Sequence, residues 1–278
     1  MANIASLHFY PVKSCAGIAP ASARLTPAGL EFDREWMIVT PEGEFVTQRQ
    51  LPRLALIATR LTDDALELAA PGMPPLAVAL DGDPARAQRP VTVWRDCVAS
   101  IDEGEPAARW LSRFLGSPLS LVRFAPDAAR LSNPAYTADH AAFAKFADAY
   151  ALLVIAGASL ADLNARLARK SLAPLPMNRF RPNLVLDGDD LGPYDEDRMT
   201  MLRAEGVALK PVKACVRCQI TTTDQQTAEV RAEPLLTLAS YRVNTDLGGP
   251  AFGQNAIVVE GNGRALRIGD HLDVEWNF

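Results

Sequence analysis

Apolar and polar residues alternate over short stretches along most of the chain, and turns rich in Pro and Gly separate these stretches. In the first half the alternation predicts strands at residues 4–10, 31–40, 45–48, 54–60, 66–69, 76–80 and 91–94. In the second half it predicts strands at residues 183–186, 201–204, 207–210, 216–223, 256–260, 265–268 and 272–276. Strands at this spacing are typical of an antiparallel barrel or a strongly curved sheet.

Two segments have a helical period. Residues 106–115 place apolar side chains on one face, and Gly116 follows as a typical stop signal. Residues 159–170 begin with Ser159 and carry Asp162 three positions later, an arrangement similar to a capping box. The Pro- and Ala-rich stretch 124–136 interrupts these patterns. We therefore expect a mainly β protein with some helices (α+β) and a domain boundary near residue 125.

Composition and charge limit the class of partner. The 278 residues are 49% hydrophobic, which is enough for one large core or two moderate ones. We expect no membrane partner, because no apolar run is long enough to span a bilayer. The first residues lack the basic and apolar regions of a signal peptide, so a cytoplasmic location is expected. The net charge of −5, with both signs intermixed, argues against nucleic acid.

The pair Cys215 and Cys218, with Val216 and Arg217 between them, is the first candidate for chemistry. Two cysteines could be half of a zinc site, but no second pair is present to complete it. They could form a thioredoxin-like redox pair, but apolar and β-branched residues continue after them as in a strand. They could also be two half-buried structural cysteines. Arg217 favours chemistry, because a neighbouring cation stabilises the thiolate that binds metals.

Basic and polar residues in three other segments could bind an anion. Lys13 and Ser14 follow the first predicted strand. Two interpretations are open: the pair binds an anion, or Lys13 is a solvated side chain in a turn. Arg34 lies within a strand pattern and either pairs with a carboxylate or points into a pocket. Arg181 and Asn183 share one face of an extended segment, where they suit a phosphate or heterocycle, or an ordinary salt bridge. Residues 251–255 are expected to form a loop before a strand.

These five segments, in this order, resemble the MOSC family with its N-terminal MOSC β-barrel partner. Bacterial YcbX-type proteins and the mitochondrial amidoxime-reducing component are similar over nearly the whole chain. The resemblance implies a smaller N-terminal β-rich domain at residues 1–125 and a MOSC β-barrel domain at residues 126–278. The first strand and the Lys13 loop are expected to pack onto the cofactor site of this second domain.

The resemblance also implies the cofactor, a molybdenum bound by a single pyranopterin dithiolene (molybdopterin). Cys218 matches the metal ligand and the catalytic position, and a soft thiolate suits such a metal. The positions that match contacts to the cofactor are Lys13, Ser14, Arg34, Arg181, Asn183, Val216, Arg217 and Asn255. We expect no iron–sulfur cluster in this chain, because it lacks a four-cysteine motif.

The activity that the resemblance implies is reduction of N-hydroxylated compounds such as amidoximes and hydroxylamines. The electrons would come from a separate donor protein of the ferredoxin, flavoprotein or cytochrome type. The alternative within the same fold is a carrier of the molybdenum cofactor, or a sulfurtransferase with a persulfide on Cys218. A simple two-cysteine redox or zinc protein would leave Lys13, Arg34 and Arg181 unconnected.

Overall fold

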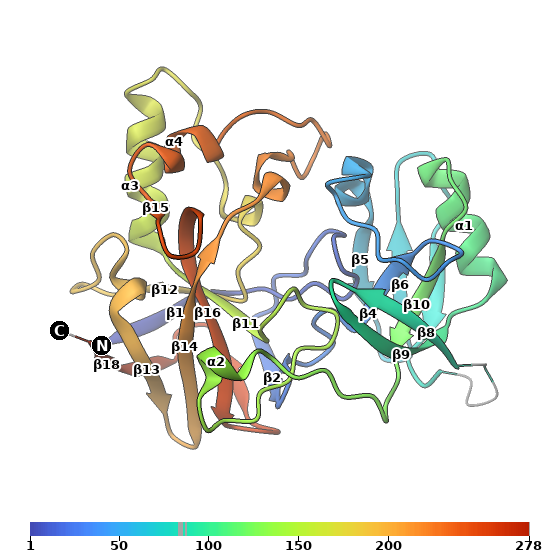
Figure 1. Ribbon diagram of the computed structural model, residues 1–278, viewed down its shortest axis with the longest axis horizontal. Coiled ribbons are helices and arrows are strands. Elements are labelled where there is room, and N and C mark those ends of the chain that lie inside the picture. Colours follow the sequence, from blue (N-terminus) through green and yellow to red (C-terminus); the bar gives the residue numbers. More distant parts are fainter. Residues whose placement is uncertain (83–85, 87, 278) are drawn as a thin grey trace.

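Strands from both ends of the chain build the larger sheet (Figure 1). The computed structural model describes residues 1–82, 86 and 88–277. The order of the strands is β11 (Leu152–Ala156), β12 (Leu184–Asp187), β1 (Ala2–Leu7), β18 (His271–Trp276), β13 (Met199–Ala204), β14 (Val207–Val216), β16 (Gly249–Glu260) and β15 (Val243–Asn244). Because β11 also pairs with β16, seven of these strands close into a barrel. The expected mainly β fold is confirmed.

The barrel is held together by a core of aliphatic side chains. Alternate residues of β1, among them Ile4 and Leu7, are buried there with Leu184 of β12 and Leu209 of β14. All five residues of β11 are buried, because the barrel core covers one face and α3 (Gly157–Ala168) with α4 (Leu235–Ala239) lies over the other (Figure 1). The first strand therefore completes a barrel made mainly from residues beyond 150, whereas the domain division at residue 125 stays a prediction.

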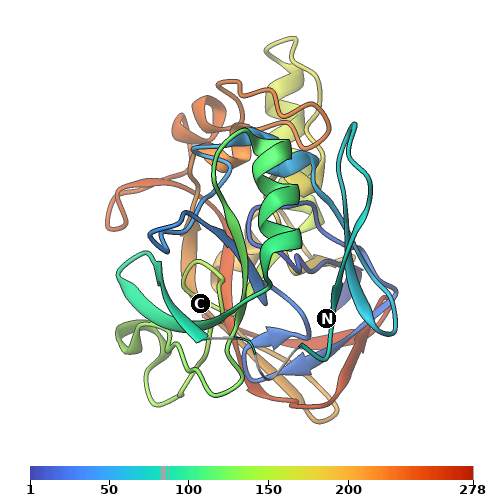
Figure 2. The same ribbon diagram turned by 90° about the vertical axis from the view of Figure 1, so that its right-hand side faces the viewer.

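The rest of the structure up to residue 125, called the N-terminal part below, has its own core. A sheet of β4 (Trp36–Val39), β10 (Ser120–Phe124), β9 (Asp96–Asp102) and β8 (Gln88–Val93) lies beside a sheet of β5 (Ala58–Leu61), β6 (Ala65–Ala69) and β7 (Leu76–Ala79). The helix α1 (Glu105–Leu115) buries Trp110 and Leu111 in this core and faces the viewer in Figure 2. Gly116 ends α1 in the left-handed conformation, so the predicted helix and its stop are confirmed.

Several predicted strands are absent or shorter, and the reason lies in local hydrogen bonds. Residues 31–35 form turns before β4, with Arg34 in the left-handed conformation. Residues 52–56 form a 3-10 helix before β5, and of residues 45–48 only Phe45 forms a bridge, with Val39. The strand predicted at residues 216–223 ends at Val216. There Thr221 and Thr222 donate their hydroxyls to backbone carbonyls and favour the 3-10 helix η4 (Gln219–Thr222).

Two further predictions are wrong in a way that matters for the site. Residues 251–255 lie inside β16 and not in a loop. A Cβ at Gly253 would lie 2.9 Å from the Val154 carbonyl oxygen, so the glycine lets β16 approach β11. Arg181 is not extended but has a φ of 56°. The predicted cap at Ser159 is also wrong, because α3 begins at Gly157.

Glu196 is a buried acid in the barrel part and gives stability a pH dependence. Ser159 Oγ donates to its Oε2 at 2.7 Å, and Oε1 has no partner among the described residues. Burial raises the pKa of Glu196 from 4.5 to about 7. Because the folded state holds the proton more tightly, stability falls as pH rises through this interval, by up to about 3 kcal/mol. Chemical denaturation between pH 4 and 8 should show this loss for the wild type and not for Glu196→Gln. Parallel profiles for the two proteins would contradict it.

Candidate functional site

One cavity between the barrel and the N-terminal part collects all the residues that the sequence singled out. Its lining includes Lys13, Ser14, Arg34, Arg181, Asn183, Val216, Arg217, Cys218 and Asn255, together with Cys215. They come from five segments spread over more than 240 residues of sequence. Their convergence is a structural result, whereas their role in binding a cofactor stays a prediction.

Lys13 reaches the cavity from the loop that follows β1. Its backbone N–H donates to the Trp36 carbonyl at 2.8 Å, which fixes the loop against β4. The ammonium group is buried and donates to the Phe146 carbonyl at 2.8 Å and to Asp148 Oδ1 at 2.5 Å. Burial lowers the pKa of Lys13, and Asp148 opposes this shift. Two of the three N–H donors of the ammonium group are therefore used by the protein.

Arg34 and Arg181 enclose the ring of Tyr10. Their guanidinium carbons lie 4.3 Å and 4.1 Å from the ring centroid, as in cation–π contacts. The Tyr10 hydroxyl donates to the Pro182 carbonyl at 3.0 Å, and Arg181 Nη1 donates to the Cys15 carbonyl at 2.6 Å. Burial raises the pKa of Tyr10 to about 12, so it remains a neutral spacer between two cations. The sequence analysis did not identify Tyr10 as part of the site.

Asn183 joins the barrel to the turn that carries Arg34. Its Oδ1 accepts from the Leu153 N–H and from Arg34 Nη1, both at 3.1 Å. Its Nδ2 donates to the His8 carbonyl at 3.1 Å and to Asp33 Oδ2 at 3.0 Å. Asp33 also pairs with Arg34. The buried amide therefore satisfies donors and acceptors from strand β11, the end of β1 and the Arg34 turn.

Three cavity residues have the left-handed backbone conformation, which is unfavourable for any residue with a Cβ atom. Ser14, Arg34 and Arg181 have φ values of 68°, 47° and 56°. Each such residue costs about 1–2 kcal/mol relative to a right-handed conformation. Strain of this kind collects at functional sites when the surrounding contacts hold it in place. The sequence contained no signal for it, because none of the three is a glycine.

Arg217 directs its guanidinium to the sulfur of Cys215. Its Nη1 donates to Cys215 Sγ at 2.8 Å and its Nη2 donates to the Phe180 carbonyl at 2.6 Å. Burial raises the pKa of Cys215, and Arg217 opposes this shift. Of the two cysteines of the pair, the one whose sulfur Arg217 contacts is therefore Cys215.

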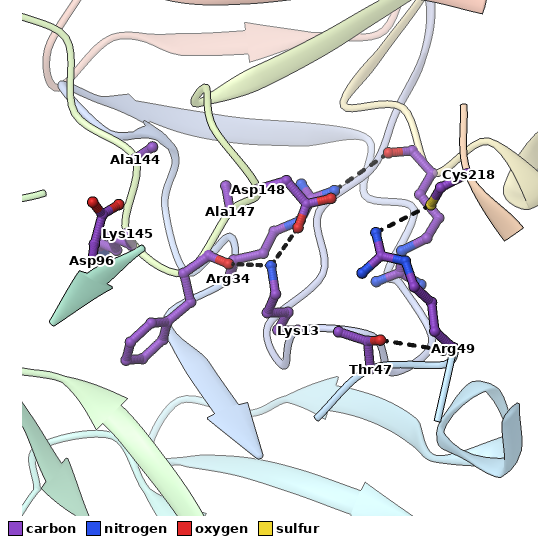
Figure 3. A network of polar contacts seen from close by, with 12 residues as sticks. Lys13, Arg34, Thr47, Arg49, Asp96, Ala144, Lys145, Ala147, Asp148 and Cys218 are labelled. Carbon is purple, nitrogen blue, oxygen red and sulfur yellow. Dashed lines mark hydrogen bonds and ion pairs between the residues drawn. The ribbon is translucent and has the colours of Figure 1, made fainter. Parts of the chain in front are cut away.

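Cys218 follows the end of β14 and precedes η4. Its carbonyl accepts from the Thr221 N–H and hydroxyl at 3.1 Å and 3.0 Å, which holds the residue in a tight turn. The guanidinium that reaches its sulfur belongs to Arg49, whose Nη2 donates to Cys218 Sγ at 3.2 Å (Figure 3). Arg49 and Cys218 are 169 residues apart in sequence, so the pattern around the cysteines could not reveal this contact.

Val216 and Asn255 enter the cavity from neighbouring strands of the barrel. Val216 is the last residue of β14 and pairs with Ala251 of β16. Asn255 lies further along β16, opposite Leu153 of β11, and its Nδ2 donates to the Lys213 carbonyl at 3.2 Å. Both side chains are half-buried and form part of the cavity wall.

Asp148 is a cavity residue that the sequence analysis missed. Its side chain is 61% exposed and forms an ion pair with Lys13 (Figure 3). Desolvation raises the pKa of Asp148, but the charge and hydrogen bond of Lys13, together with the charges of Arg49 and Arg34, hold the pKa below its usual range. Buried Arg130 fixes the loop around it by donating to the carbonyls of Ala144, Lys145, Ala147 and Asp148, and also pairs with Asp96. No motif in the Ala-rich sequence around Asp148 indicated this arrangement.

The cavity carries an excess of positive charge. Four cationic side chains and one carboxylate line it: Lys13, Arg34, Arg181 and Arg217 against Asp148. Arg217 Nε is buried and has no hydrogen-bond partner in the described part of the chain. Within these same residues no group of three His, Cys, Asp or Glu side chains gathers as a metal site. The arrangement therefore fits an anionic ligand near the thiols of Cys215 and Cys218 better than a metal held by protein ligands alone.

Family comparison agrees with this architecture. Residues 1–118 match the MOSC N-terminal beta barrel domain and residues 143–273 match the MOSC domain. The chain belongs to the MOSC family. It is 38% identical to human mitochondrial amidoxime-reducing component 1 over 96% of this chain and 81% of that protein. Bovine mitochondrial amidoxime reducing component 2 is 34% identical over 87% of this chain and 72% of that protein.

A third relative has a different name and is much longer. Rice molybdenum cofactor sulfurase is 32% identical over 86% of this chain, but the match covers only 31% of that protein. Among the described residues, no helix combines the length and the hydropathy that crossing a bilayer requires.

The bonds of Asn183 predict a large effect on stability. Asn183→Ala removes four hydrogen bonds and leaves the bond from Arg34 to the Arg181 carbonyl as a remaining link, so we expect a loss of about 3 kcal/mol or more in the free energy of unfolding. Asn255→Ala removes one bond from a half-buried amide and should cost less than about 1 kcal/mol. Urea unfolding measures both. Equal losses would show that Asn183 does not join the two parts.

Proposed function

We propose that this protein is a molybdenum-cofactor-dependent oxidoreductase that reduces N-hydroxylated compounds, such as amidoximes, with electrons from a separate donor protein. The observation that carries this proposal is the convergence of Cys218 with the cations of Lys13, Arg34, Arg181 and Arg217 in one cavity. The amidoxime-reducing relatives support the reaction type. A cytoplasmic location and the class of the donor remain part of the proposal.

The residues of the cavity fit the proposed cofactor. It carries a phosphate and a dithiolene, and the excess of cations would compensate their negative charge. Arg217 Nε offers a buried donor that has no protein partner among the described residues. Ser14 adds a hydroxyl, and Asn255 lies on the barrel wall. Cys218 would supply the thiolate ligand, which is a soft donor suited to this metal.

The cofactor would supply the two-electron chemistry: an amidoxime, two electrons and two protons give an amidine and water. The protein would bind the cofactor, orient it against Cys218 and keep the charges balanced. Asp148 lies on the cavity with its pKa held low by Lys13, so it stays a carboxylate near neutral pH. In this role it compensates cationic charge and orients the substrate, and it does not donate the protons.

A second function within the same family uses the same cysteine. The match to part of a molybdenum cofactor sulfurase favours a carrier of the cofactor, or a sulfurtransferase that holds a persulfide on Cys218. The exposed side of the cavity at Asp148 would admit either a small substrate or a sulfur acceptor. A mass increase of one sulfur atom on Cys218 in metal-free protein would favour this alternative.

Metal content and turnover distinguish the two functions. Protein from a host that makes the cofactor and is supplied with molybdenum should contain close to one molybdenum per chain. It should convert benzamidoxime to benzamidine with a chemical electron donor, because the exposed cavity admits small reactants. Molybdenum that stays far below one per chain when cofactor supply is raised would refute the proposal. Full molybdenum content without turnover would favour the carrier.

The ligand assignment has its own test in the two cysteines of the motif. Cys218→Ala should lose molybdenum, because the other thiol of the cavity, Cys215, has a pKa raised by burial, which disfavours the thiolate that a metal needs. Cys215→Ala should keep molybdenum at the wild-type level. Metal analysis measures both variants, and thermal unfolding checks that both remain folded. Loss of metal from Cys215→Ala alone would assign the ligand to Cys215.

A further inference from the structure

Arg49 is the cation that contacts the sulfur of Cys218, although it belongs to the N-terminal part of the structure. Its Nη2 donates to Sγ at 3.2 Å. In the part of the chain that the structure describes, no carboxylate forms an ion pair with Arg49. Both side chains are half-buried. A guanidinium is a cation and a hydrogen-bond donor at once, so the Cys218 sulfur receives both from Arg49.

The indole of Trp94 packs on the guanidinium of Arg49. Its central carbon lies 4.8 Å from the ring centroid of Trp94, and Phe45 packs on the same indole at 5.1 Å. Trp94 is the first of two turn residues between β8 and β9 and has a φ of 58°. The large side chain is 43% exposed there. A positive φ is the geometry that a two-residue hairpin turn requires at this position, and the turn presents the indole to Arg49.

The side chains of Thr47 and Gln48 anchor the segment that carries Arg49. Thr47 Oγ1 accepts from the Arg49 N–H at 3.2 Å (Figure 3). Gln48 Nε2 donates to the Ser14 carbonyl at 2.7 Å, and the side chains of Gln48 and Gln225 exchange two hydrogen bonds. Ser14 lies on the Lys13 loop and Gln225 follows η4. These bonds fix Arg49 relative to Cys218.

A donor fixed on a metal-ligating sulfur changes the properties of the metal. Hydrogen bonds and positive charge at a ligating thiolate stabilise the electron-rich, reduced state, and thereby raise the reduction potential. We propose that Arg49 is a positioning residue that orients the Cys218 sulfur toward the cofactor and raises the reduction potential of the bound molybdenum. This inference rests on the proposed function and adds to it a role for the N-terminal part.

The test compares three variants of the cofactor-loaded protein. Arg49→Gln removes the charge and keeps an N–H donor, whereas Arg49→Met removes both. Arg53→Gln is the matched control, because it removes the same charge from the same part of the structure. Arg53 is exposed and packs on Phe114 and not on Cys218. Molybdenum content and thermal unfolding are measured first. A redox titration followed by electron paramagnetic resonance then gives the reduction potential.

We expect Arg49→Met to lower the potential and to change the resonance spectrum, with a smaller shift for Arg49→Gln and none for Arg53→Gln. With a fixed chemical donor, kcat for benzamidoxime should fall several-fold in Arg49→Met while KM changes less than twofold. Trp94→Ala should shift the potential in the same direction, because it frees the guanidinium, and Trp94→Phe should restore it. These two variants keep Arg49 and test the same contact if Arg49→Met does not fold.

The outcomes separate this inference from the proposed function. A folded wild type that holds no molybdenum overturns both. Wild type and Arg49 variants with equal molybdenum and equal potentials overturn the role of Arg49 alone and leave the proposed function intact. A shift in Arg53→Gln as large as in Arg49→Gln would also overturn it, because the effect would then come from net charge and not from the contact with sulfur.

Discussion

The buried amide of Asn183 is the contact on which the arrangement of the site depends. It connects the backbone of β11, the end of β1 and the turn that carries Asp33 and Arg34. An amide has donors and acceptors at opposite ends, so one side chain can satisfy a carboxylate, a guanidinium and two backbone groups at the same time. A carboxylate at this position would repel Asp33, and an apolar residue would leave these groups without partners. The geometry of the cationic cavity follows from this link.

The repulsion between the cations of Arg34 and Arg181 lowers the stability of the folded state, so apolar burial elsewhere in the fold has to offset it. Arg34 and Arg181 approach each other around Tyr10, and both adopt strained backbone conformations. Burial lowers the pKa of Arg181 to about 10, which shows the cost of keeping this cation out of water. The closed barrel and the separate core below α1 supply the compensating apolar burial. An anion in the cavity would relieve the repulsion, so ligand binding and stability should be coupled.

Sequence reasoning located the strands of the barrel and the residues of the cavity but not the local shape of the site. Alternation predicts β13 and β6 well, because one face of each strand packs on a core. Arg34 and Arg181 looked extended, and only long-range bonds to Tyr10, Cys15 and Asn183 show why the chain turns there. Asp148 and Arg49 carry no motif. Their importance arises from contacts with Lys13 and Cys218, which are more than 130 residues away in sequence.

The position of Arg49 also explains why the N-terminal part and the barrel work as one unit. The barrel supplies Cys218 and the wall of the cavity, while the N-terminal part supplies Lys13, Arg34 and Arg49. Lys13 is tied to Asp148, and Arg130 ties the Asp148 loop to Asp96 of β9. Each part therefore holds charged groups that only the other part neutralises. Separating the parts would expose these charges to water and remove the donor from the Cys218 sulfur, so an intact interface is a condition for a complete site.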